Sequence, residues 1–124
     1  MDVTALKRHC RFLPGSVEQR YADPANILTY AVGGKRFAYF KTSEPERWRF
    51  SFKVAPERFL ELTDQPGIKP ARWLGIHRWV TVVDVASVPT TELKALVAWS
   101  YGYAWDRLTR RQRAAILADD ASTG

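Results

Sequence analysis

Residues 47–54 read Arg-Trp-Arg-Phe-Ser-Phe-Lys-Val, and apolar and polar side chains alternate along this stretch without a break. Successive side chains of a β-strand point to opposite faces of its sheet, so the period of two predicts a half-buried strand. On one face lie the apolar side chains Trp48, Phe50, Phe52 and Val54. The other face carries three cations in a row, Arg47, Arg49 and Lys53. This strand therefore supplies a core on one side and a basic surface on the other.

Two further strands are predicted just before this stretch. Residues 27–32 and 36–42 are rich in strand-forming residues and are joined by Gly33-Gly34-Lys35. Tight hairpin turns need positive φ, which glycine adopts without strain. A phosphate-binding loop is disfavoured here because the helix that should follow it is missing. Together with residues 47–54, the two runs predict a three-stranded antiparallel meander. A longer strand is predicted over residues 73–84, bent at Gly75.

Helices are predicted on both sides of these strands. Asp2 is the expected N-cap of a first helix that ends near residue 11, and Pro56 begins a short helix to about residue 63. Apolar residues recur every three or four positions over residues 93–108, the period of an amphipathic helix. Thr109 and Gln112 form a capping box that opens a terminal helix to about residue 118. Residues 16–26 and 64–70 are expected to be connecting loops.

Length and composition favour one α+β domain over residues 1–118, with a frayed tail at residues 119–124. The fold class we expect is a two-layer arrangement, with an antiparallel sheet backed by helices. Cys10 is the only cysteine, so an internal disulfide is excluded, which fits a reducing cytoplasm. The chain shows neither a signal-peptide pattern at its start nor an apolar run of about 20 residues. We therefore expect a soluble, cytoplasmic monomer without membrane contact.

Catalytic and metal-binding chemistry find little support in the sequence. His77, Asp84 and Ser100 could in principle supply a base, an orienting acid and a nucleophile. Nothing around Ser100 resembles a nucleophile elbow, and this residue falls within the apolar stripe of its helix, where its hydroxyl is expected to bond back to that helix. Two histidines and one cysteine without paired spacing do not make a zinc site. We expect no enzyme activity, no metal and no cofactor.

The charge pattern gives the strongest functional indication. The formal net charge is +6 and the pI is about 9.8, a balance that favours anionic partners. Residues 35–78 hold ten Lys or Arg against five Asp or Glu, interleaved with Tyr39, Trp48 and Trp79. Cations bind phosphates and aromatic faces stack on unpaired bases. The candidate nucleic-acid-binding residues are Lys35, Arg36, Lys41, Arg49, Lys53 and Arg78. A separate C-terminal cluster consists of Arg107, Arg110, Arg111 and Arg113.

Two alternatives remain open at this point. The aromatic side chains could all belong to the core, with the charges serving ordinary solvation; for Trp48, on a uniformly apolar strand face, this is the expected interpretation. The domain could also be a protein-interaction module of the chaperone or adaptor kind, which would show an exposed apolar patch of several hundred Å².

Several short motifs follow one another in an order that is specific in combination. They are Leu13-Pro14-Gly15 with Glu18, Val32-Gly33-Gly34-Lys35 with Phe37-Ala38, Ser51-Phe52-Lys53, Pro56, Gly67, Pro70-Ala71, Gly75 with His77 and Trp79-Val80, and Ser100-Tyr101. In this order the chain resembles the MmcQ/YjbR family of small bacterial proteins. One departure is visible, since Arg78 stands between the histidine and the tryptophan that often adjoin in that family.

The resemblance implies an α+β fold of frataxin-like or secretion-chaperone-like shape. It also implies a DNA-binding role through a double-wing arrangement of hairpins, in agreement with the basic residues of the predicted hairpin. A frataxin-like iron role would need an acidic first helix, whereas this helix carries Lys7, Arg8 and Arg11. The function we predict is non-enzymatic nucleic-acid binding, with DNA as the expected partner. A protein-interaction module is the alternative.

Overall fold

The computed structural model describes residues 1–123 and contains six strands. They are β1 (Ser16–Tyr21), β2 (Ile27–Val32), β3 (Lys35–Lys41), β4 (Phe50–Lys53), β5 (Ile68–Pro70) and β6 (Trp79–Val82). All neighbouring pairs are antiparallel, and the strands form one sheet in the order β1-β2-β3-β4-β6-β5. Because β6 lies between β4 and β5, the short β5 forms one edge of the sheet. Strand β1 forms the other edge.

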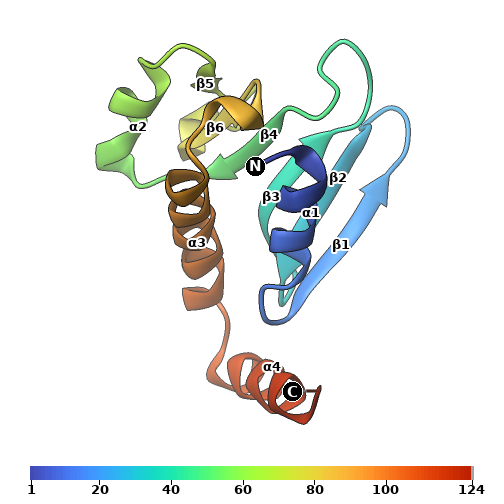
Figure 1. Cartoon of the computed structure of the whole chain (residues 1–124). Helices are drawn as coiled ribbons and strands as arrows, with labels where there is room; N and C mark the ends of the chain where they lie inside the picture. Colours follow the sequence, from blue (N-terminus) through green and yellow to red (C-terminus); the bar gives the residue numbers. More distant parts are fainter. Residues whose placement is uncertain (124) are drawn as a thin grey trace.

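The helices complete a two-layer α+β fold. They are α1 (Val3–Arg11), α2 (Pro56–Thr63), α3 (Thr90–Asp106) and α4 (Arg110–Thr123), with short 3-10 turns η1 (Gly75–His77) and η2 (Val85–Ser87). Helices α1 and α3 cover one face of the sheet, α2 lies beside β5, and α4 follows α3 at the bottom of the view (Figure 1). The expected fold class, an antiparallel sheet backed by helices, is confirmed.

The core lies between the sheet and helices α1 and α3. One row of paired residues on this face of the sheet crosses four strands. It consists of the buried side chains Phe40, Phe50, Val82 and Ile68. Leu6 and Cys10 of α1 and Leu93 and Val97 of α3 pack against the same cluster. Burying a phenylalanine side chain contributes about 2 kcal/mol, so this row is a large part of the driving force for folding.

Several local predictions are confirmed. Asp2 caps α1 by accepting a 2.8 Å hydrogen bond from the amide of Ala5, and Pro56 stands in the first turn of α2. The hairpin of β2 and β3 turns through Gly33 and Gly34, whose φ angles of 55° and 79° lie in the region that glycine tolerates. The capping box opens α4, since Thr109 and Gln112 exchange hydrogen bonds of 2.9 and 3.1 Å.

The strand predicted over residues 47–54 is shorter than expected. Only Phe50–Lys53 forms β4, because the backbone at Trp48 turns into the left-handed region with φ of 68°. That turn directs the indole of Trp48 toward the helix side, where the ammonium of Lys7 lies 3.7 Å from the ring centroid and Phe40 packs edge-on. The core interpretation of Trp48 is therefore confirmed, while the alternation at residues 47–49 did not indicate a strand.

The long strand predicted over residues 73–84 is confirmed only over Trp79–Val82, which forms β6, and two predicted loops are wrong. Residues 71–78 form the connection from β5 to β6, with positive φ at Trp73 and Arg78 on either side of η1. The supposed loops at residues 16–26 and 64–70 contain β1 and β5. Most side chains of the edge strand β1 are exposed, and β5 has three residues, so neither shows an apolar alternation in the sequence.

The terminal helix extends beyond its predicted end. Helix α4 continues through Thr123, past residue 118, so the tail expected to be frayed is helical as far as the structure describes it. Gly124 lies outside the described residues. Within residues 1–123, no helix has both the length and the apolar character needed to cross a bilayer.

Candidate functional site

The face of the sheet opposite α1 and α3 carries a row of polar side chains. Strand register places Tyr39, Ser51, Thr81 and Lys69 side by side across β3, β4, β6 and β5. This row alternates with the buried row of the core, because neighbouring residues of a strand face opposite sides. We refer to this side of the sheet as the open face.

A hollow of about 390 Å³ lies on the open face, and we call it the open-face groove. Its lining includes Ser51 and Thr81, which are almost fully buried and whose hydroxyl oxygens lie 2.7 Å apart in a hydrogen bond. Aromatic lining comes from Tyr39 and from Trp73. Among the described residues, the cations that line it are Arg36, Lys41, Lys69 and Arg72, and the one carboxylate is Glu46. The groove therefore combines neutral, apolar and aromatic lining with a surplus of positive charge.

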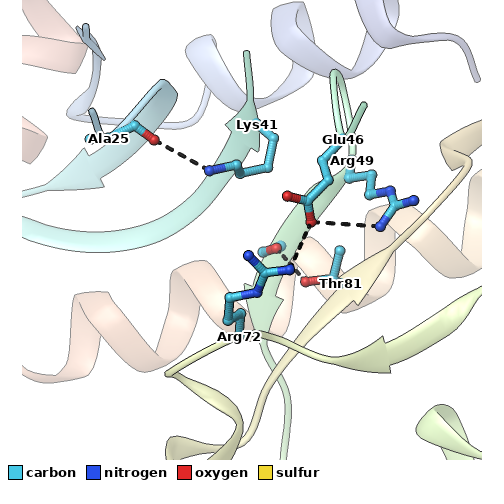
Figure 2. Close-up of polar contacts among 7 residues, drawn as sticks. Ala25, Lys41, Glu46, Arg49, Arg72 and Thr81 are labelled. Carbon is cyan, nitrogen blue, oxygen red and sulfur yellow. Dashed lines mark hydrogen bonds and ion pairs between the residues drawn. The ribbon is translucent and has the colours of Figure 1, made fainter. Parts of the chain in front are cut away.

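Glu46 organises the arginines at one side of this groove. Its Oε2 atom lies 3.6 Å from Nη1 of Arg49 and 3.8 Å from Nη2 of Arg72 (Figure 2). Lys41 extends from β3 and donates a 3.3 Å hydrogen bond to the carbonyl oxygen of Ala25 (Figure 2). One carboxylate shared between two guanidinium groups neutralises at most one of them, so the surroundings of the groove keep a surplus of positive charge.

A second hollow of about 320 Å³ lies where α3 meets the sheet. Arg36 lines it as well, together with Lys53 and Arg107, and its lining contains no carboxylate among the described residues. The Lys53 ammonium lies 4.8 Å from the ring centroid of Tyr103, and the Arg107 guanidinium lies 5.8 Å from the same centroid. Partial burial, and after it the nearby charges of Arg107 and Arg78, lower the pKa of Lys53 from its usual value. Cations that repel one another in this way favour binding of an anion between them.

The two hollows adjoin at an aromatic pair. Tyr39 lines the open-face groove and Trp79 lines the second hollow, and their rings stack with centroids 5.8 Å apart and an interplanar angle of 28°. Arg36 lines both hollows. The basic surface is thus continuous from Lys41 and Arg72 to Arg107.

The structure brings together three of the six predicted binding residues. Arg36 and Lys41 line the open-face groove, and Arg36 and Lys53 line the second hollow. The Lys53 ammonium also donates a hydrogen bond to the carbonyl oxygen of His77.

The other three predicted residues lie outside both hollows. Lys35 is at the hairpin turn opposite Val32, and Arg49 is paired with Glu46. Arg78 lies over the ring of Phe59 on α2, with its guanidinium carbon 5.4 Å from the centroid.

Four residues of the basic surface were missing from the prediction. Lys69, Arg72 and Trp73 lie in or just after a segment that was interpreted as a loop, and only the pairing of Lys69 with Thr81 of β6 places this segment on the same sheet as β3. Arg107 was assigned to a separate C-terminal cluster, but it lines the second hollow with Lys53. Lys69 and Arg72 belong to the excess of cations that the sequence shows within residues 35–78. That excess indicated a basic surface but did not show where in the fold these two residues lie.

Ser100 has a structural role. Its hydroxyl donates a 2.7 Å hydrogen bond to the carbonyl oxygen of Phe37 and accepts a 3.1 Å hydrogen bond from the amide of Lys53. The expectation that it bonds back to its own helix is therefore wrong. In the described part of the chain, no group of three or more His, Cys, Asp or Glu side chains has a geometry that could hold a metal ion.

Comparison with known proteins places these features in a family. The family model described as YjbR matches residues 12–103. The solved structure of protein DR2400 from Deinococcus radiodurans, with domain DUF419, is 30% identical, with a TM-score of 0.77 over 93% of this chain and 87% of that one. A solved structure of a protein from Pseudomonas syringae is 17% identical, with a TM-score of 0.68 over 84% of this chain and 99% of that one, a likeness of fold alone. A search of curated proteins finds no match.

Proposed function

The chain belongs to the YjbR family, and for this member we propose non-enzymatic binding of nucleic acid, DNA first, on the open face of the sheet. The observation that carries the proposal is the open-face groove, with four cationic side chains against the single carboxylate of Glu46 among the described lining residues. Its basic surface continues through Arg36 to Lys53 and Arg107 in the second hollow. Phosphates of a nucleic-acid backbone are the abundant anions that match such an extended basic surface.

The arginines and lysines have different expected roles. A guanidinium binds a phosphate through two parallel N–H groups, so Arg36, between the two hollows, is the expected anchor. Lys41 and Lys69 act as point charges on flexible stems and are expected to contribute to affinity without fixing orientation. Since these contacts engage the backbone, we expect strong salt dependence and little preference for base sequence.

The charge of the open-face groove supports this proposal over a protein-interaction module. Phe12, Leu60 and Leu117 are exposed large hydrophobic residues that lie on or next to α1, α2 and α4 respectively, whereas the exposed Trp73 lines the open-face groove. A peptide-docking surface is expected to gather such residues in one patch of several hundred Å². The open-face groove instead combines apolar and aromatic lining with four cations and one carboxylate, and this surplus of positive charge favours a polyanion over a neutral peptide.

The test is a fluorescence anisotropy titration of labelled DNA with the wild-type protein and two matched variants. Arg36→Glu/Lys41→Glu reverses two charges of the groove, and Arg110→Glu/Arg111→Glu makes the same change on α4. We expect binding at low salt that weakens by roughly 100-fold or more from about 50 to about 200 mM salt.

The groove variant is expected to lose at least about tenfold in affinity, and the α4 variant clearly less. Circular dichroism confirms that both variants are folded. The proposal is overturned if the wild type fails to bind at low salt, or if the two variants lose affinity equally.

A further inference from the structure

We infer that the open-face groove accommodates an unpaired base of a single-stranded nucleic acid, with the phosphates on its basic surroundings. This inference rests on the proposed function and specifies the kind of nucleic acid that the groove takes. Its basis is a combination of shape, lining chemistry and one exposed tryptophan.

The shape of the site favours a single strand. A volume of about 390 Å³ is within the range of pockets that enclose a small organic ligand. A duplex presents phosphates on its outside and keeps its bases stacked inside, so it could contact the surrounding cations but could not fill the hollow. An unpaired nucleotide can do both, because its base is free to leave the backbone.

The chemistry at Ser51 and Thr81 favours a base over a phosphate at that place. The two hydroxyls share a 2.7 Å hydrogen bond and carry no charge. Ile27 and Tyr39 add apolar and aromatic surface to the lining. A phosphate placed over the two hydroxyls would lose part of its hydration, whereas the flat face of a base fits a neutral surface and leaves the phosphates to the surrounding cations.

Trp73 supplies a stacking surface. It is 88% exposed, lines the groove, and has a φ of 67°, in the left-handed region that a tryptophan rarely adopts. Within residues 1–123 it takes part in no ring pair and no cation–π contact, unlike Trp48, Trp79, Trp99 and Trp105. A large indole held out in a strained backbone beside four cations has the properties of a base-stacking platform.

The experiment compares a labelled single-stranded DNA of about 12 nucleotides with the duplex of the same sequence, by anisotropy. We expect the single strand to bind at least about tenfold more tightly than the duplex. Trp73→Ala should weaken single-strand binding by about tenfold and leave duplex binding within about twofold, while Trp73→Phe should retain most of the affinity. Phe12→Ala, which removes an exposed aromatic residue next to α1, is the control.

The outcomes separate this inference from the proposed function. Equal or tighter binding of the duplex, or unchanged single-strand binding by Trp73→Ala, overturns the inference. The proposed function still holds in that case if the Arg36→Glu/Lys41→Glu variant loses duplex binding. Absence of binding to both DNA forms at low salt overturns the proposed function and the inference together.

Discussion

The hydroxyl of Ser100 on α3 donates a 2.7 Å hydrogen bond to the carbonyl oxygen of Phe37 on β3. The ladder between β3 and β4 ends at the pair of Ala38 with Phe52, so Phe37 and Lys53, the next residues at this end, are not paired with each other. Ser100 occupies this position and also accepts a hydrogen bond from the amide of Lys53 on β4. One small side chain thus joins both strands to α3, next to the second hollow.

Ser100→Ala is expected to lower the free energy of unfolding by about 2 kcal/mol, because it leaves a buried carbonyl and an amide without partners. Ser87→Ala removes an exposed hydroxyl that bonds the carbonyl of Asp84 and is expected to change stability by less than about 0.5 kcal/mol. Urea unfolding of the wild type and of both variants measures the two changes in the free energy of unfolding. Equal stability of the two variants would show that the Ser100 hydrogen bonds contribute nothing.

Glu46→Gln is expected to strengthen DNA binding several-fold. The carboxylate competes with phosphates for Arg49 and Arg72, and its removal raises the net charge beside the groove by one. Anisotropy titrations at several salt concentrations measure the effect, which should shrink as salt screens the charges. Glu57→Gln makes the same charge change in the first turn of α2 and is expected to have a smaller effect. Weaker binding by Glu46→Gln would indicate that Glu46 instead holds the arginines in a binding position.

Gly33→Ala and Gly34→Ala should differ in stability although they are neighbours in one turn. Both residues have positive φ, so an alanine at either costs about 1 kcal/mol in backbone strain. A Cβ at Gly33 would also lie 2.5 Å from Cδ2 of Leu108, whereas a Cβ at Gly34 meets nothing within 4 Å.

We expect Gly33→Ala to be less stable than Gly34→Ala by a further 1 kcal/mol or more, roughly the cost of overpacking. Thermal or urea unfolding of both variants gives the difference. A difference near zero would mean that Leu108 moves aside freely, and that the hairpin turn is not firmly packed against the end of α3.

Stability should fall at alkaline pH because of Cys10. Burial, and to a smaller extent the carboxylate of Glu18, raises the pKa of the Cys10 thiol to about 12 from its ordinary value of 9.0. The unfolded chain then loses this proton at lower pH than the native protein does. The stabilising contribution of the thiol is complete below about pH 9 and is lost as the pH rises toward 12, by about 1 kcal/mol at pH 10.

Urea unfolding at about pH 8 and about pH 10 tests whether the free energy of unfolding falls as the pH rises. Cys10→Ala should be less stable at the lower pH and show a shallower decline. Burial and the 2.6 Å hydrogen bond to Glu18 also raise the pKa of the Tyr30 phenol, so some decline with the same sign should remain in the variant. Identical slopes for the two proteins would contradict a buried, protonated thiol.

The sequence by itself determined the elements whose signals are local. Asp2 before α1, Pro56 in α2, Gly33-Gly34 in the hairpin and Thr109 with Gln112 at α4 act on backbone groups a few residues away. Such interactions depend on chain neighbours and are therefore visible in the order of residues. The basic character and the α+β class followed in the same way from composition and periodicity.

Only the tertiary structure decided which cations share a surface. Lys69 and Arg72 join Arg36 and Lys41 because β6 inserts between β4 and β5, which places Lys69 in the row of Tyr39, Ser51 and Thr81. Strand order depends on how all apolar faces are buried together, and no stretch of sequence contains that information alone. The left-handed turns at Trp48 and Trp73 are non-local for the same reason, since residues with an intrinsic preference for strands adopt them where packing requires it.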